Sequence, residues 1–214
     1  MKTAYLSRAG GGERGADVAM AIEGADVTGS QAYARDCFPI AAVGASAGGL
    51  APTRELLGHL GEKPGVAVVV IHHLDPTHES GLVDILSRAT AMPVVVASEG
   101  LRVERDHVYV VPPNAGLLIA QGILKIVPRV EEGGLHLPID RFFESLALDR
   151  NTLAIGVVLS GSGCDGTEGV KALKAEGGMT FAQDAGAEHA SMPQSAKTLD
   201  RCLNMVRVNC TRSG

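Results

Sequence analysis

Short apolar runs alternate along the chain with segments in which apolar residues recur at helical spacing. Residues 66–71 form a continuous apolar run of strand length, and the segment before them carries Leu50, Leu56, Leu57 and Leu60 at helical intervals. Further strands are predicted at 39–43, 92–97, 108–111, 154–159 and 179–182, and further helices at 80–88, 139–148, 167–176 and 193–199. Such alternation is typical of a parallel sheet covered by helices.

Two apolar segments, 117–120 and 123–127, are joined only by Gln121-Gly122. A two-residue link that contains glycine suits a tight turn, so this part predicts a small β-hairpin. The whole pattern predicts the α/β class, with a doubly wound, mainly parallel sheet, helices on both faces in a Rossmann-like three-layer arrangement, and the hairpin as an addition.

The first 37 residues differ from the rest, because they are rich in Gly, Ala and Asp and show little sustained apolar period. We expect residues 1–37 to be a flexible N-terminal tail and residues 38–214 to be one domain. A length of 214 residues agrees with one domain and a tail.

Composition excludes several classes of function. Hydrophobic residues make up 45% but aromatic residues only 3%, so the core must consist of Val, Leu, Ile and Ala, as in strands buried on both faces. A net charge of -5 without a basic stripe makes nucleic acid an improbable partner. No apolar run approaches the roughly 20 residues of a membrane helix, so we expect no membrane insertion and a cytoplasmic location.

Three predicted strands end in residues that can carry chemistry. They are followed by Gly44-Ala45-Ser46-Ala47-Gly48-Gly49, by His72-His73 and by Ser160-Gly161-Ser162-Gly163-Cys164-Asp165-Gly166. In open parallel sheets, sites form beyond the carboxyl ends of the strands. A hydroxyl, an imidazole and a carboxylate are therefore expected at one rim.

The first of these segments matches G-x-S-x-G, the strand-turn-helix motif that lifts a nucleophilic serine above a sheet. In this interpretation Ser46 is the nucleophile, and Gly48 allows the sharp turn. The N–H of Ala47, at the start of the following helix, would stabilise negative charge on a carbonyl oxygen. The alternative is a turn of small residues that merely packs a helix on a strand.

A histidine is the usual base for a serine nucleophile, because its pKa near 6.5 lets it accept and return a proton at neutral pH. Periodicity alone does not choose between His72 and His73, since successive strand residues point to opposite faces. The i, i+5 spacing of His73 and His78 does not suit a metal pair on a helix, so we expect no metal.

The third segment has two interpretations. Gly161, Gly163 and Gly166 fit G-x-G-x-x-G, and Asp184 follows near the spacing of a dinucleotide-binding fingerprint. In the other interpretation the same glycines form a tight loop that turns Asp165 toward the histidine, as the acidic member of a triad. An ordinary helix N-cap is a further role for this aspartate. The order Ser, His, Asp disfavours an α/β-hydrolase lipase or esterase.

Taken together, the segments resemble the catalytic domain of the CheB protein-glutamate methylesterases, as found in CheB/CheR sensory fusion proteins. The resemblance rests on five blocks in family order between Ile40 and Val206. They are residues 43–50, 70–80, 107–114, 137–143 and 158–167. Alignment with the family's Val-Gln-His-Leu-Asp-Pro segment assigns the base to His73, and the last block assigns the acid to Asp165.

The resemblance implies a serine hydrolase that removes methyl groups from glutamate γ-methyl esters, and deamidates certain glutamines, on the cytoplasmic helices of methylated chemoreceptors or sensor proteins. It implies no cofactor, and a CheR-type methyltransferase as a further partner. The loop residues Ser162 and Gly163, with Ala47, are candidates to support the oxyanion. The hypotheses kept beside it are the dinucleotide-binding module and a non-catalytic docking domain of a sensory complex.

Overall fold

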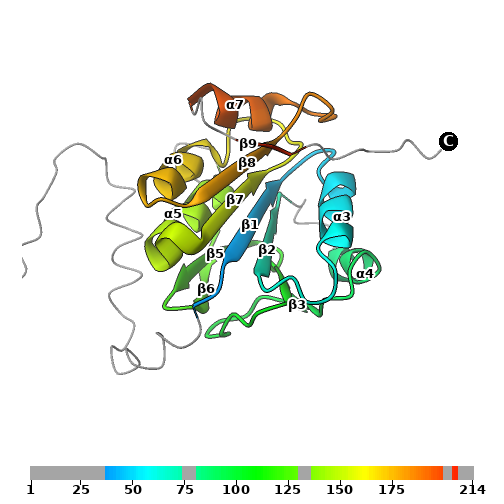
Figure 1. Ribbon diagram of the computed structural model, residues 1–214, viewed down its shortest axis with the longest axis vertical. Coiled ribbons are helices and arrows are strands. Elements are labelled where there is room, and N and C mark those ends of the chain that lie inside the picture. Colours follow the sequence, from blue (N-terminus) through cyan, green and yellow to red (C-terminus); the bar gives the residue numbers. More distant parts are fainter. Residues whose placement is uncertain (1–36, 74–80, 130–135, 200–203, 207–214) are drawn as a thin grey trace, which may run out of the picture.

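The computed structural model describes residues 37–73, 81–129, 136–199 and 204–206, and its centre is a sheet of seven strands (Figure 1). The strands lie in the order β3-β4-β2-β1-β7-β8-β9, and every neighbouring pair is parallel. Their bounds are β1 Ile40–Ala45, β2 Ala67–His72, β3 Val94–Val96, β4 Val108–Val110, β7 Ala154–Val158, β8 Met179–Gln183 and β9 Asn204–Val206. Because all pairs are parallel, the carboxyl ends of the strands meet at one rim.

Helices cover both faces of this sheet. One face packs against α3 (Leu50–His59) and α4 (Leu82–Ser87), and the other against α5 (Pro138–Arg150), α6 (Thr167–Ala175) and α7 (Ser191–Leu199). A 3-10 turn, η2 (Asn151–Leu153), leads from α5 into β7. Side chains of β2 alternate between the two layers, with Val69 and Ile71 on the α5 side and Val68 and Val70 on the α3 side. This two-sided burial explains its continuous apolar sequence.

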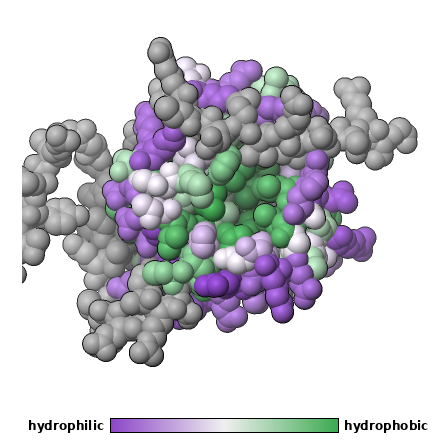
Figure 2. Space-filling view, in the orientation of Figure 1, coloured by the Kyte–Doolittle hydropathy of each residue, from purple (hydrophilic) through white to green (hydrophobic). Residues whose placement is uncertain are grey.

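The apolar layer on the α3 side is less completely covered than the other. Ile155 and Phe181 belong to it but are only partly buried, and Met179 is 48% exposed. Figure 2 shows hydrophobic residues gathered over the central part of the face seen in Figure 1, with hydrophilic residues around them.

The predicted hairpin is present as β5 (Ala115–Ala120) and β6 (Ile123–Pro128), which pair in antiparallel register. Gln121 and Gly122, which join them, have φ values of 53° and 73°, the left-handed backbone of a tight two-residue turn. The hairpin packs on α5, where the Ile119 N–H donates to the buried Ser145 hydroxyl at 3.1 Å.

The structure confirms the predicted α/β fold class, with differences in the bounds of several elements and one added strand. β1 continues through Gly44, where the sequence predicted the start of the turn. α7 begins at Ser191, two residues before Pro193, and β9 was not predicted. The proposed tail, apart from Cys37, lies outside the described residues, so the boundary at residue 37 stays a prediction. No helix in the described ranges combines the length and the hydropathy that crossing a bilayer would require.

Candidate active site

The three segments singled out in the sequence meet at the carboxyl rim of β1, β2 and β7. β1 lies between the other two strands, with Ala45 paired to His72 on one side and Gly44 paired to Val158 on the other. The pairing continues past the strand ends, because the His73 N–H donates to the Ala45 carbonyl at 3.1 Å and the Ser46 N–H to the Ser160 carbonyl at 2.9 Å. Ser46 is thus flanked by the segments that carry His73 and Asp165.

The turn after β1 uses its glycines for different reasons. A Cβ at Gly44 would lie 2.5 Å from Ile139 Cγ2 of α5, so this position lets helix and strand approach closely. Gly48 has a φ of 70°, a conformation that side chains other than glycine rarely adopt. Ser46 is half-buried, and a Cβ at Gly161 would lie 2.9 Å from the Ser46 Cβ. Among the described residues, no hydrogen bond joins the Ser46 hydroxyl to His73.

Ser160, which the sequence analysis did not single out, holds this turn in place. Its buried hydroxyl donates to the Ala47 carbonyl at 2.9 Å and accepts the His189 N–H at 2.9 Å. Its own N–H donates to the buried Gln183 side-chain oxygen at 2.9 Å. These bonds tie the turn after β1 to the loop before α7, two segments far apart in sequence.

His73 is the histidine that faces the acidic residue. Its Nε2–H donates to Asp165 Oδ2 at 2.7 Å, and its side chain is 24% exposed. Since an ionised carboxylate can only accept, the bonded nitrogen carries the proton, and Nδ1 is left with the basic lone pair. The imidazole is therefore held in the tautomer that can take a proton at Nδ1.

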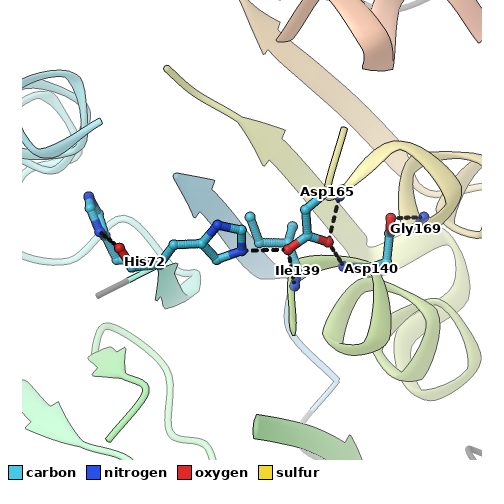
Figure 3. Close-up of polar contacts among 7 residues, drawn as sticks. His72, Ile139, Asp140, Asp165 and Gly169 are labelled. Atoms are coloured by element: carbon cyan, nitrogen blue, oxygen red, sulfur yellow. Dashed lines mark hydrogen bonds and ion pairs between the residues drawn. The ribbon is translucent and has the colours of Figure 1, made fainter. Parts of the chain in front are cut away.

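His72 points the other way, as the alternation of β2 requires. In Figure 3 its ring lies away from Asp165, and its Nδ1–H donates to the His73 carbonyl at 3.3 Å. Burial lowers the pKa of His72 below its usual 6.5, which keeps the ring neutral. The ambiguity between the two histidines is thus resolved by the strand register, and His72 is a packed residue.

Asp165 is buried at the N-terminus of α5 rather than at that of its own following helix (Figure 3). Its Oδ2 accepts the Ile139 N–H at 3.0 Å, and its Oδ1 accepts the Asp140 N–H at 2.9 Å and the Gly166 N–H at 2.9 Å. The expected alternative, a cap on α6, is not what the structure shows, because Gly166 occupies that position and no side-chain cap is made there. The first turn of α5 instead fixes the carboxylate that binds His73.

Asp140 is a second buried carboxyl beside Asp165, and the sequence analysis gave it no role. Its Oδ1 accepts the Gly169 N–H in the first turn of α6 at 2.7 Å. Burial first, and the neighbouring Asp165 charge second, raise the pKa of Asp140 to about 7. An acidic residue just after a helix-initiating proline suggests only a local cap, so the sequence signal for this longer-range role was weak.

The glycine loop does not have the features of a dinucleotide site. The N-terminus of α6, where a pyrophosphate would bind in that interpretation, already holds the Asp140 carboxyl. Of the two loop residues predicted to support an oxyanion, Gly163 donates its N–H to the Ser191 hydroxyl at 3.1 Å. Within the described residues, the N–H groups of Ala47 and Ser162 have no hydrogen-bond acceptor, so the prediction that they serve as oxyanion donors stays open for both.

A pocket of about 180 Å³ adjoins His73. It lies between the end of β2, the turn before the hairpin and the start of α5. Its polar lining includes His72, His73, Asn114, Arg129 and His136, and the His136 ring centroid lies 6.2 Å from that of His73. Within the described ranges, no group of three His, Cys, Asp or Glu side chains has the arrangement of metal ligands. His78, whose spacing from His73 the sequence analysis judged unsuitable for a metal pair, lies outside those ranges.

A family model and the curated relatives of this chain point to the same protein family. The family described as CheB methylesterase matches residues 41–209. A "Protein-glutamate methylesterase/protein-glutamine glutaminase 2" of Pseudomonas syringae pv. syringae is 34% identical over 168 residues, which is 78% of this chain and 50% of that protein. An uncharacterized 104.1 kDa protein of Rhodobacter capsulatus is 37% identical over 131 residues, 59% of this chain and 14% of its own length.

The fold has a solved counterpart. The CheB methylesterase catalytic domain of Thermotoga maritima superposes with a TM-score of 0.73 at 24% identity, covering 80% of this chain and 93% of that one. The chain spans about half the length, or less, of the curated relatives cited above. With most of its residues matched by the family and its sheet matched by this domain, the chain belongs to the CheB methylesterase family.

Proposed function

We propose that this chain hydrolyses glutamate γ-methyl esters with Ser46 as nucleophile, His73 as base and Asp165 as the residue that orients the base. The observation that carries the proposal is the 2.7 Å hydrogen bond between His73 and Asp165 on the rim beside Ser46. Two further facts support it. Ser46 and His73 directly follow the paired residues Ala45 and His72, and neighbouring strands lie only about 5 Å apart.

The two side chains also share a face of the sheet. His73 continues the alternation of Val69 and Ile71 toward α5, and Ser46 continues that of Gly44, whose missing side chain makes room for Ile139. A nucleophile and a base that follow paired residues of adjacent strands are neighbours, and the proposal requires the serine rotamer to bring Oγ within hydrogen-bond reach of His73 Nδ1 during the reaction. Such bonds are often long before substrate binds.

In the proposed reaction, His73 Nδ1 takes the proton of the Ser46 hydroxyl while Oγ attacks the ester carbonyl carbon. The Ala47 and Ser162 N–H groups stabilise the oxyanion that forms. The C–O bond to the methoxy group then breaks, and His73 returns the proton so that methanol leaves. Water, activated by the same imidazole, attacks the acyl-enzyme and releases the glutamate carboxylate. With a glutamine side chain the leaving group is ammonia, which gives deamidation.

The proposed substrate is a methylated cytoplasmic helix of a chemoreceptor or related sensor protein, with a CheR-type methyltransferase supplying the methyl ester in the cytoplasm. The names of the curated relatives, methylesterase and glutaminase, support this substrate class. The pocket beside His73 supports it as well, because its described lining includes Arg129 but no acidic side chain, which suits a substrate helix that carries glutamates.

A fluorophosphonate probe tests the proposal, because it reacts with activated serine hydroxyls. Wild type should be labelled and should release methanol from methylated receptor helices, whereas Ser46→Ala should do neither. Ser162→Ala is the matched control, since it removes an exposed hydroxyl of the same rim but keeps the backbone N–H; it should be labelled like wild type. Equal labelling of wild type and Ser46→Ala would refute the assignment of the nucleophile.

A further inference from the structure

Asp140 is a buried carboxyl that the proposed reaction does not use, although it lies directly behind Asp165. The residue is 6% exposed. Its backbone N–H donates to Asp165 Oδ1 at 2.9 Å, and its side chain accepts the Gly169 N–H at 2.7 Å. It is therefore bonded at once to the residue that orients the base and to the helix that follows that residue.

The two aspartates cap each other's helices. Asp165 lies just before α6, yet its carboxylate accepts N–H groups from the first turn of α5. Asp140 lies in that turn of α5, yet its carboxyl accepts an N–H from the first turn of α6. Free N–H groups at a helix start are satisfied here by a partner helix rather than by the residue that precedes them.

Helices α5 and α6 pack so closely at Gly169 that there is no room for a side chain there. A Cβ at Gly169 would lie 2.5 Å from the Phe143 Cβ and 3.1 Å from the Asp140 carbonyl. The Asp140–Gly169 bond therefore joins the helices where their backbones come close together. Because α6 begins two residues after Asp165, a shift of α6 along α5 would carry the Asp165 carboxylate with it.

We propose that Asp140 is a positioning residue for the reaction proposed above: it locks α6 onto α5 and so holds the Asp165 carboxylate where it accepts the His73 N–H. The inference rests on the proposed function, and it assigns Asp140 no contact with substrate. When the Asp140 side chain is removed, the Asp165 carboxylate still accepts the N–H groups of Ile139 and Asp140 on α5. The loop that carries Asp165 then loses the hydrogen bond that fixes the start of α6 to α5.

Charge gives the proposal a second, separable consequence. The groups that act electrostatically on Asp140 are Glu144 on α5, Glu168 on α6 and Asp165 in the loop, all of them acidic. Beyond Asp165 lies His73, and Glu168 also pairs with Lys171 at 2.7 Å. Above about pH 7, where Asp140 is ionised, a second negative charge stands behind the His73–Asp165 pair, and Asp140→Asn removes this charge while it keeps an acceptor for the Gly169 N–H.

The test measures fluorophosphonate labelling rates of the full chain from pH 5 to 9 for wild type, Asp140→Ala, Asp140→Asn and Ser145→Ala. Asp140→Ala should lose about 10- to 100-fold in rate at pH 8, as is common when a residue that supports a functional side chain is removed. Asp140→Asn keeps an acceptor for Gly169, so it should retain most of the rate. Its rate should depart from that of wild type mainly above pH 7, where wild-type Asp140 carries its charge.

Ser145→Ala is the matched control, because it also deletes a buried hydrogen bond of α5, but one directed at the hairpin. It should lower the melting temperature and leave the labelling rate within about threefold, a change below 1 kcal/mol in barrier. Labelling of Asp140→Ala as fast as that of Ser145→Ala would overturn the inference. If Asp140→Ala does not fold, Gly169→Ala takes its place, because it forces the two helices apart where this bond lies, and labelling within threefold of wild type then overturns the inference.

A readout independent of activity separates this inference from the proposed function. The His73 N–H held by Asp165 should give a low-field proton NMR resonance that disappears in His73→Gln and weakens or shifts in Asp140→Ala. If the fluorophosphonate does not label wild type, the hydrolase proposal is refuted. The positioning role is then tested by the His73 N–H resonance alone, compared between wild type and Asp140→Ala. An identical resonance in wild type and Asp140→Ala would refute that role.

Discussion

Replacing Asp140 by asparagine should stabilise the protein, and by an amount that grows with pH. Burial and the Asp165 charge raise the pKa of this carboxyl from 3.8 to about 7. Between these values the folded state binds more protons than the unfolded state, so the free energy of unfolding falls as pH rises. Asparagine keeps an oxygen that accepts the Gly169 N–H but carries no charge.

The size of the effect follows from the same values. At about 1.4 kcal/mol per pKa unit, the rise to about 7 costs the folded state roughly 4 kcal/mol once the carboxyl is fully ionised. Relaxation around a buried charge reduces such costs, so we expect Asp140→Asn to be about 2–4 kcal/mol more stable than wild type at pH 8. At pH 4.5, where Asp140 is protonated when folded, the gain should be at most about 1 kcal/mol.

Urea unfolding of wild type and variant at pH 4.5, 6, 7 and 8 measures this directly. Ser145→Ala is the control, since it alters a neutral buried group of the same helix and should change stability by the same amount at every pH. A gain for Asp140→Asn that does not vary with pH, or a loss at pH 8, would refute the account of this carboxyl as a buried group that ionises at the expense of stability.

Three further substitutions test the rest of the structure. Asp165→Asn places an amide NH₂ group opposite the N–H groups of His73 and Ile139, and so favours the imidazole tautomer with its proton on Nδ1. Fluorophosphonate labelling should then fall by about 10³- to 10⁴-fold, and a loss below tenfold would contradict the orienting role. Gly169→Ala forces α6 off α5 at Phe143 and should lower the free energy of unfolding by about 1–3 kcal/mol, and unchanged urea unfolding would contradict the tight contact. Ser160→Ala leaves the Ala47 carbonyl and the His189 N–H without their partner, so we expect a loss of about 1–3 kcal/mol in urea unfolding and slower labelling of Ser46, and wild-type values for both would count against its role.

The strands were predictable because a parallel sheet leaves a strong mark on its sequence. Val68 to Ile71 are all apolar since each is buried by one helical layer or the other. The hairpin was predictable from Gln121-Gly122, whose left-handed backbone a glycine favours. β9 was missed because its three residues become a strand only by pairing with β8, which no local pattern reveals.

The sequence predicted which segments lie at the carboxyl ends of the strands, but not the hydrogen bonds between their side chains. The rule that sites follow the carboxyl ends of parallel strands led to the segments of Ser46, His73 and Asp165. Strand alternation alone did not separate His72 from His73, since that choice depends on which face α5 covers. Asp140 and Ser160 were missed because their partners lie 23 or more residues away, and hydrogen bonds over such separations have no periodic signature in the sequence.

The exchanged caps of α5 and α6 have a consequence for how the protein matures. Neither helix start is complete until the other has docked, and Asp165, which accepts the His73 N–H, reaches its place in that same docking event. A chain emerging from the ribosome therefore cannot form the His73–Asp165 bond until both helices have been made and have packed together.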